Sequence, residues 1–177
     1  MSTPHPADRP ADPAAVDPAE FARTNWWLHD AHWFAAVART CGLDAANDAN
    51  LEAVERVARG AVLQLRRQGT VVPPTTTQEL TDLFRRLWDL FFPVGMYRES
   101  AFSLRDGEAV WTGTQCRAYE QIARAGLLAG YRCGCVGFRD GVARGLGVPF
   151  RHEIRESLVA GDPRCVVVYA LGPEGSS

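Results

Sequence analysis

Apolar residues recur at the spacing of amphipathic helices through the first half of the chain. This pattern predicts three helices, at about residues 18–40, 44–68 and 76–93. Asp17 and Pro18 are the residue types favoured at an N-cap and at the first helical position, so they mark the start of the first helix. Glycines follow the first two helices and a proline ends the third, as expected where helices stop.

The second half of the chain alternates between strand-like and helical patterns. Two β-leaning runs within residues 96–114 flank Arg105, Asp106 and Gly107, which is the signal of a hairpin turn. Helical spacing returns in two segments, at residues 115–131 and 136–147. A second hairpin follows, with strands at 150–159 and 165–171 around the turn "AGDPR". We therefore expect an α+β fold, in which N-terminal helices pack on an antiparallel sheet of about four strands made of two hairpins.

The composition fits one globular domain flanked by short tails. Residues 1–16 contain almost nothing to bury and are expected to be a disordered tail; residues 17–172 form the predicted domain, and 173–177 a short second tail. The net charge of -2 includes no basic run, so we expect neither a nucleic-acid partner nor an anionic membrane surface. Without an export signal or a membrane-length apolar run, we expect a cytoplasmic protein whose five cysteines are reduced.

A helical wheel of the first helix places a carboxylate on its apolar side. The predicted stripe contains Trp26, Trp33, Val37 and Cys41, with Trp27 and Phe34 at its edge, and Asp30 falls in its middle. A core-facing carboxylate is costly unless it is bonded or faces a cavity, so Asp30 is either a structural acid or a site residue. His29 lies on the flank, and His32 points away and is expected to be solvated. The indoles of Trp26 and Trp33 are expected to be core residues, or the walls of a substrate pocket.

Glu55 lies inside the apolar stripe of the second helix, which contains Leu51, Val54, Ala58, Val62 and Leu65. It is either a substrate-binding residue or the partner of Arg59 in an ion pair within the helix.

Four of the cysteines follow the spacing C-x16-C-x-C-x29-C, at Cys116, Cys133, Cys135 and Cys165. Zinc sites usually combine two closely spaced pairs, so a single C-x-C is a partial match. We therefore expect no metal or other cofactor, with zinc or iron on these four sulfurs as the alternative. Free cysteines also pack as small apolar residues, and this is the expectation for Cys41 and, less strongly, for Cys165.

The cysteine-bearing segments resemble a known family. "TQCRAYEQ", the C-x-C segment and "AGDPRC" running into "VVVYAL" are similar to the C-terminal half of the L-2-amino-thiazoline-4-carboxylic acid hydrolase-like family, and more distantly to 4-vinyl reductase-type small-molecule-binding domains. Cys116 and Glu120 match a cysteine followed by an acid. Cys133 or Cys135 matches the second cysteine, and a Gly-Asp-x-x-Cys turn matches Gly161, Asp162 and Cys165.

The first half also resembles uncharacterised bacterial relatives of that family, through Asp30, Trp33 and Phe34. The chain departs from many 4-vinyl reductase-type domains at Ser157, where those have another cysteine. Because thiols in those domains can hold zinc, this departure makes the same metal site doubtful here.

The resemblance implies an enzyme that opens, or in the reverse direction closes, a C–N bond of a small heterocyclic or amino-acid-derived substrate. Cys116, at a predicted helix N-terminus that favours its thiolate, is the first candidate nucleophile, followed by Cys135 or Cys133. Asp30 or His29 is expected to carry a proton, and Glu120 is the acid that the motif places beside Cys116.

Arg117 or Arg139 is expected to bind the substrate carboxylate, because a guanidinium can donate two parallel hydrogen bonds to it. The alternative function is a non-catalytic small-molecule-binding or sensor domain, possibly with a metal on the cysteines. The partner in either case is a small molecule. A wide apolar helix face is also compatible with a homodimer.

Overall fold

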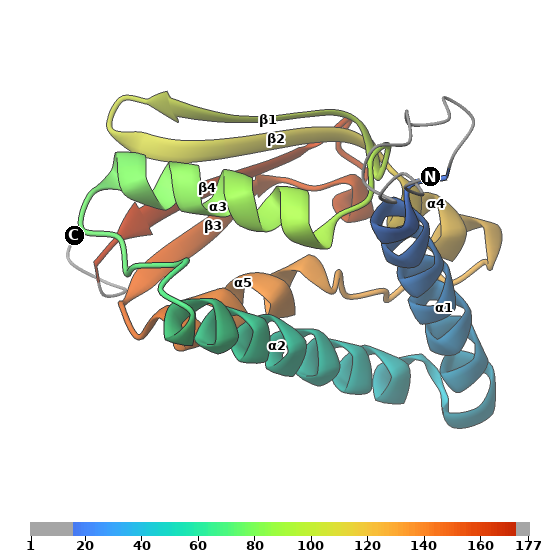
Figure 1. Ribbon diagram of the computed structural model, residues 1–177. Coiled ribbons are helices and arrows are strands. Elements are labelled where there is room, and N and C mark those ends of the chain that lie inside the picture. The colour runs from blue at the N-terminus through green and yellow to red at the C-terminus, as the bar shows by residue number, and fades with distance from the viewer. Residues whose placement is uncertain (1–15, 173–177) are drawn as a thin grey trace, which may run out of the picture.

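The computed structural model describes residues 16–172, so the predicted tails lie outside the described residues apart from Val16. It confirms the α+β fold (Figure 1). The elements are α1 (Pro18–Cys41), α2 (Leu43–Arg67), α3 (Thr77–Phe91), β1 (Tyr97–Arg105), β2 (Glu108–Cys116), α4 (Arg117–Arg124), α5 (Cys135–Leu146), β3 (Phe150–Glu156), a 3-10 turn (Leu158–Ala160) and β4 (Cys165–Leu171).

The four strands form one antiparallel sheet in the order β1-β2-β4-β3, so two hairpins meet where β2 pairs with β4. The first hairpin turns at the predicted residues, with positive φ angles of 52° at Asp106 and 80° at Gly107. These are the backbone conformations that asparagine, aspartate and glycine tolerate best, which explains why the turn was visible in the sequence.

Local capping chemistry sets the helix starts. The Asp17 side chain accepts a hydrogen bond from the Ala19 N–H at 2.9 Å. At α3 a capping box forms, in which Thr76 Oγ1 accepts from the Glu79 N–H and Glu79 Oε2 accepts from the Thr76 N–H. The helical prediction for residues 115–131 extends too far, because α4 ends at Arg124, shortly before Gly126 takes a positive φ of 70°.

One face of the sheet carries the main core. Side chains of β2 and β4 such as Trp111 and Tyr169 pack there with residues of α2, α3 and α5, while Val110 and Val168 belong to a separate small cluster. Residues alternate between the two clusters along each strand, as the period of a pleated strand requires. In Figure 1, α3 lies against the strands and α2 runs alongside α5.

Helices α2 and α5 pack with their backbones in close approach. Gly137, Gly141 and Gly145 follow each other at four-residue intervals on α5. A Cβ atom at these positions would lie 2.5 Å from Leu51 O, 2.3 Å from Glu55 O and 2.8 Å from Val62 Cβ, respectively. No side chain fits at these three places without displacing α2. This contact fixes the position of the first turn of α5, which carries Cys135 and Arg139.

The predicted apolar stripe of α1 is wrong in detail. Trp26 is 62% exposed and Trp33 38% exposed, and Cys41, expected to pack in the core, is also exposed. The buried positions are instead Phe34 and two small residues, Ala35 and Ala38. Apolar residues lie around the whole circumference of α1, so the wheel could not select a face. Phe34 and Ala38 belong to a buried cluster with Ala46 of α2 and Ile122 of α4.

No helix within residues 16–172 is both long enough and apolar enough to cross a bilayer.

Candidate functional site

A cavity of about 540 Å³ lies between the sheet and the surrounding helices. Every layer of the fold contributes to its walls, including α1, the middle of α2, the end of α3, β2, α4 and the first turn of α5. Most of the lining is apolar, and its larger side chains are aromatic: Trp26, Trp27, Phe91, Tyr97, Trp111 and Phe138. Tyr131, from the segment before α5, packs edge-on against Phe34 of α1 with ring centroids 5.3 Å apart.

Four cysteines predicted as site residues line this cavity: Cys116, Cys133, Cys135 and Cys165. Tyr97 of β1 lies among them, with its Oη 3.7 Å from Cys135 Sγ. Tyr97 also lowers the pKa of the Cys116 thiol, and the Cys133 and Cys135 side chains shift each other's pKa in opposite directions. The fold therefore brings three thiols from different segments around one buried phenol.

The Cys133–Cys135 pair is electrostatically asymmetric. A hydrogen bond from the Cys133 thiol lowers the pKa of Cys135 to about 6 against the effect of burial, with further lowering by the Arg139 charge and by Tyr97. The same hydrogen bond, followed by burial, raises the pKa of Cys133 well above its usual value. Of the two sulfurs, Cys135 is therefore the one that ionises more readily, with its thiolate stabilised by the Cys133 thiol.

Cys116 differs from the expectation that its thiolate is favoured. It is the N-cap of α4, and the backbone N–H groups of Ala118 and Tyr119 lower its pKa, in the direction that a helix N-terminus should act. Burial has the larger effect, because only 7% of the residue is exposed, and the pKa rises to about 12. Cys116 therefore ionises less readily than Cys135, whose pKa is lowered.

Arg139 lies one turn after Cys135 on α5 and is 2% exposed. Its Nε–H donates to Tyr169 Oη at 3.0 Å, and its Nη1–H donates to the Cys135 carbonyl oxygen at 3.1 Å. The guanidinium lies over the rings of Trp111 and Tyr169, 5.8 and 5.9 Å from their centroids. Arg117, the other predicted carboxylate ligand, is exposed at the start of α4 on the cavity lining.

The predicted acids and histidine occupy different environments. Asp30 lines the cavity, and burial raises its pKa against the opposing effect of His29. His29 itself is exposed and stacks on Trp26 at 6.0 Å between ring centroids. Glu120 also belongs to the lining and pairs with Arg124 at 3.6 Å.

Trp33 and Glu55, both predicted to bind substrate, are not part of the lining. Glu55 forms its ion pair with Arg144 of α5, not with Arg59 as the helical spacing suggested. A short-range rule could not find this partner, because Arg144 approaches from another helix. Glu55 thus contributes to the α2–α5 contact.

Sequence reasoning missed a residue that supports the C-x-C segment. Asn47 of α2 is fully buried; its Nδ2–H donates to the Gly130 carbonyl at 2.8 Å, and its Oδ1 accepts from the Arg132 N–H at 2.9 Å. Asn50, one turn later, is 5% exposed, and its Oδ1 has no partner within residues 16–172. Asn47 and Asn50 continue the apolar stripe of Leu51 and Val54, so the sequence placed two amides on a buried helix face. Because buried amides need hydrogen-bond partners, this position could have marked them as residues that bind another segment.

The alternative of a metal on the four cysteines requires their sulfurs to lie close together. Over the described range 16–172, no three or more His, Cys, Asp or Glu side chains are arranged to hold a metal ion. Cys165, the fourth proposed ligand, instead accepts a hydrogen bond from the Leu158 N–H at 3.5 Å. Ser157, which stands where many 4-vinyl reductase-type domains have a cysteine, caps the same turn: its Oγ accepts a hydrogen bond from the Val159 N–H.

No family model and no curated protein matches the chain. Solved structures share its fold. The phenol-responsive sensory domain of the transcription activator PoxR, determined with phenol, superposes with a TM-score of 0.57 at 9% identity, covering 82% of this chain and 74% of that one. A trafficking protein particle complex subunit 3 from Naegleria fowleri, covalently bound to palmitic acid, gives 0.56 at 12% identity, covering 85% and 96%.

Proposed function

We propose that this chain is a small-molecule-binding domain whose ligand occupies the cavity between α1, α5 and the sheet. The observation that carries the proposal is the cavity itself, which has about 540 Å³ of space and a predominantly apolar, aromatic lining. Pockets for small organic ligands typically have volumes of about 300–1,000 Å³ and contain a few convergent polar groups. Here those groups are Cys135, Tyr97 and Arg139.

The lining favours a ligand with a flat apolar body. Aromatic side chains from α1, α3, β2 and α5 can stack on such a ring or meet its edge. The shared fold supports the proposal, since the PoxR domain of this fold responds to phenol. A sensory role would follow if ligand binding changes how α1, which forms one wall and is largely exposed, contacts a partner.

The proposal is tested by reducing the cavity volume. Ala31 of α1 lines the cavity, whereas Ala36 on the same helix is exposed and lies outside it. Binding of phenol and 2-naphthol is measured by isothermal titration calorimetry. We expect Ala31→Leu to weaken binding by about 10-fold or more, since it occupies the space of the ligand, and Ala36→Leu to leave the Kd unchanged.

Equal affinities for wild type and Ala31→Leu, or no binding of either compound to the wild type, would contradict the proposal. If Ala31→Leu does not fold, Ala118→Leu applies the same test from the α4 wall.

A second candidate function is catalysis at a C–N bond of a small heterocycle. The observation that favours it is the position of Cys135 on the cavity lining, 3.7 Å from Tyr97 Oη, where Cys133 and Arg139 lower the pKa of its thiol. In this mechanism the Cys135 sulfur adds to the carbon of a C=N bond, and the nitrogen takes the proton. Asp30, whose pKa is raised by burial, is the candidate proton donor to that nitrogen.

The resemblance to the 2-amino-thiazoline-4-carboxylic acid hydrolase-like family supplies the substrate to test. The purified chain is incubated with 2-amino-thiazoline-4-carboxylate, and ring opening is followed by mass spectrometry. We expect Cys135→Ser to abolish turnover and Cys41→Ser, at an exposed thiol far from the cavity lining, to retain it. Absence of turnover by the wild type would leave binding as the function.

A further inference from the structure

Arg139 has hydrogen-bond donors that the protein does not use. A guanidinium carries five N–H donors. Two are bonded, to Tyr169 Oη and to the Cys135 carbonyl. The other three have no acceptor in the part of the chain that the structure describes, although Arg139 is 2% exposed and belongs to the cavity lining.

The charge of Arg139 also lacks a carboxylate partner. No ion pair among residues 16–172 includes it, and the groups that act on its charge are Tyr169, Cys135 and Cys133. Of the two carboxylates on the lining, Glu120 pairs with Arg124 and Asp30 is not in ion-pair contact with Arg139. A buried cation without a carboxylate partner is costly, and the Cys135 sulfur with the ring faces of Trp111 and Tyr169 compensates for only part of this cost.

The wall around Arg139 is short of acceptors in general. The Nε1–H of Trp111, beneath the guanidinium, is buried and has no acceptor within residues 16–172. Buried donors are normally paired, so two neighbouring side chains with unused donors indicate a place for an acceptor that the protein itself does not supply. The sulfur of Cys135, whose pKa the Arg139 charge lowers, already interacts with Cys133 and Tyr97.

We propose that the natural ligand is a carboxylic acid with a flat apolar body, whose carboxylate pairs with Arg139. This inference rests on the proposed binding function and specifies its ligand class. A carboxylate accepts two parallel N–H bonds from one guanidinium, which would use the free donors of Arg139 and neutralise its charge. The apolar body then lies against the aromatic walls near Phe138 and Tyr97.

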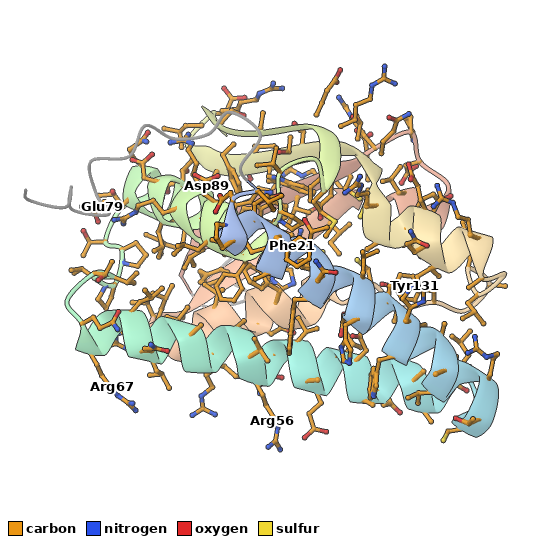
Figure 2. The ribbon with its side chains drawn as sticks, turned by 45° about the vertical axis from the view of Figure 1, so that its right-hand side comes forward. Phe21, Arg56, Arg67, Glu79, Asp89 and Tyr131 are labelled. Atoms are coloured by element: carbon orange, nitrogen blue, oxygen red, sulfur yellow. The ribbon has the colours of Figure 1, made fainter. Side chains whose placement is uncertain are left out.

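The test compares two probes of the same shape that differ in charge. Binding of 2-naphthoate and 2-naphthamide is measured by calorimetry on the full chain, with wild type, Arg139→Met, Arg139→Lys and Arg56→Met. Arg56 serves as the matched control because its side chain is 76% exposed on α2, and Figure 2 shows it directed away from the body of the molecule.

For the wild type and Arg56→Met, we expect 2-naphthoate to bind about 10-fold or more tightly than 2-naphthamide, since hydrogen bonds to charged groups are stronger than neutral ones. Arg139→Met should remove this preference while retaining 2-naphthamide binding. Arg139→Lys should keep part of the preference, because it keeps the charge but loses the paired donors.

Equal affinity of the wild type for the two probes would overturn the inference while leaving the binding function intact. A preference that persists in Arg139→Met would also overturn it. Binding of neither probe would contradict the binding function itself. Because the wild type alone distinguishes the probes, the result does not depend on whether a variant at Arg139 folds.

Discussion

Replacing Gly141 with alanine should push α5 away from α2 and disturb the wall that carries Cys135 and Arg139. The added Cβ would lie 2.3 Å from the Glu55 carbonyl oxygen and 2.9 Å from Ala58 Cβ. Ordinary contact begins at 3.4 Å, so the helices must separate locally by about 1 Å. The Glu55 oxygen belongs to the backbone of α2 and cannot rotate away as a flexible side chain would.

The expected energy follows from two opposing effects. Overpacking a well-packed contact costs about 1–3 kcal/mol, whereas alanine in place of glycine in a helix gains up to about 1 kcal/mol. We therefore expect Gly141→Ala to lower the free energy of unfolding by about 1–2 kcal/mol. Gly60 of α2 is the matched control, because a Cβ there meets nothing within 4 Å. Gly60→Ala should raise the free energy of unfolding by about 0.5–1 kcal/mol.

The assay is urea unfolding followed by tryptophan fluorescence, with midpoints compared at equal slope. Midpoints that move in opposite directions for the two variants would support the close approach of α2 and α5. If Gly141→Ala were as stable as Gly60→Ala, the backbone contact that positions Cys135 and Arg139 would be refuted.

Three further changes have defined outcomes. Burial raises the pKa of Asp30 above 3.8, so the native state binds this proton more tightly than the unfolded chain does, and the free energy of unfolding falls as the pH rises above about 4. Asp30→Asn should therefore be more stable than wild type at pH 7 but not at pH 3, as measured by urea unfolding. Asn47→Ala removes two buried hydrogen bonds and should cost about 1–3 kcal/mol in the same assay. The rate at which iodoacetamide alkylates Cys135, quantified by peptide mass spectrometry, should rise with pH about a midpoint near 6, because Cys133 and Arg139 lower the pKa of this thiol. A midpoint above pH 8 would contradict that environment.

The elements with local signals were predictable from the sequence. The N-cap at Asp17, the capping box at Thr76 and the turn at Asp106 and Gly107 each act through neighbouring residues, and the structure has all three. The same locality explains the fold class, since the order of helical and strand-like segments determined the α+β prediction.

The environment of the site was not predictable in the same way. The helix N-terminus at Cys116 is a local feature, but its pKa is governed by burial, which depends on the whole fold. Tyr97 and Cys135 lie on β1 and α5, 38 residues apart, so no spacing rule connects them. On α1, apolar residues on every side left the buried face undetermined by the sequence, and Phe34 and Ala38 are buried by packing with residues of α2 and α4.

The five tryptophans allow the binding of a ligand in the cavity to be observed directly. Trp26, Trp27 and Trp111 line the cavity, while Trp33 is exposed and lies outside it. The side-chain indole N–H resonances are followed in ¹⁵N-correlated NMR spectra during titration with 2-naphthol. We expect the resonances of the three lining indoles to shift along one saturating curve while that of Trp33 stays in place. Shifts confined to Trp33, or shifts that do not saturate, would mean that the compound binds only to the surface and that the cavity is not a ligand site.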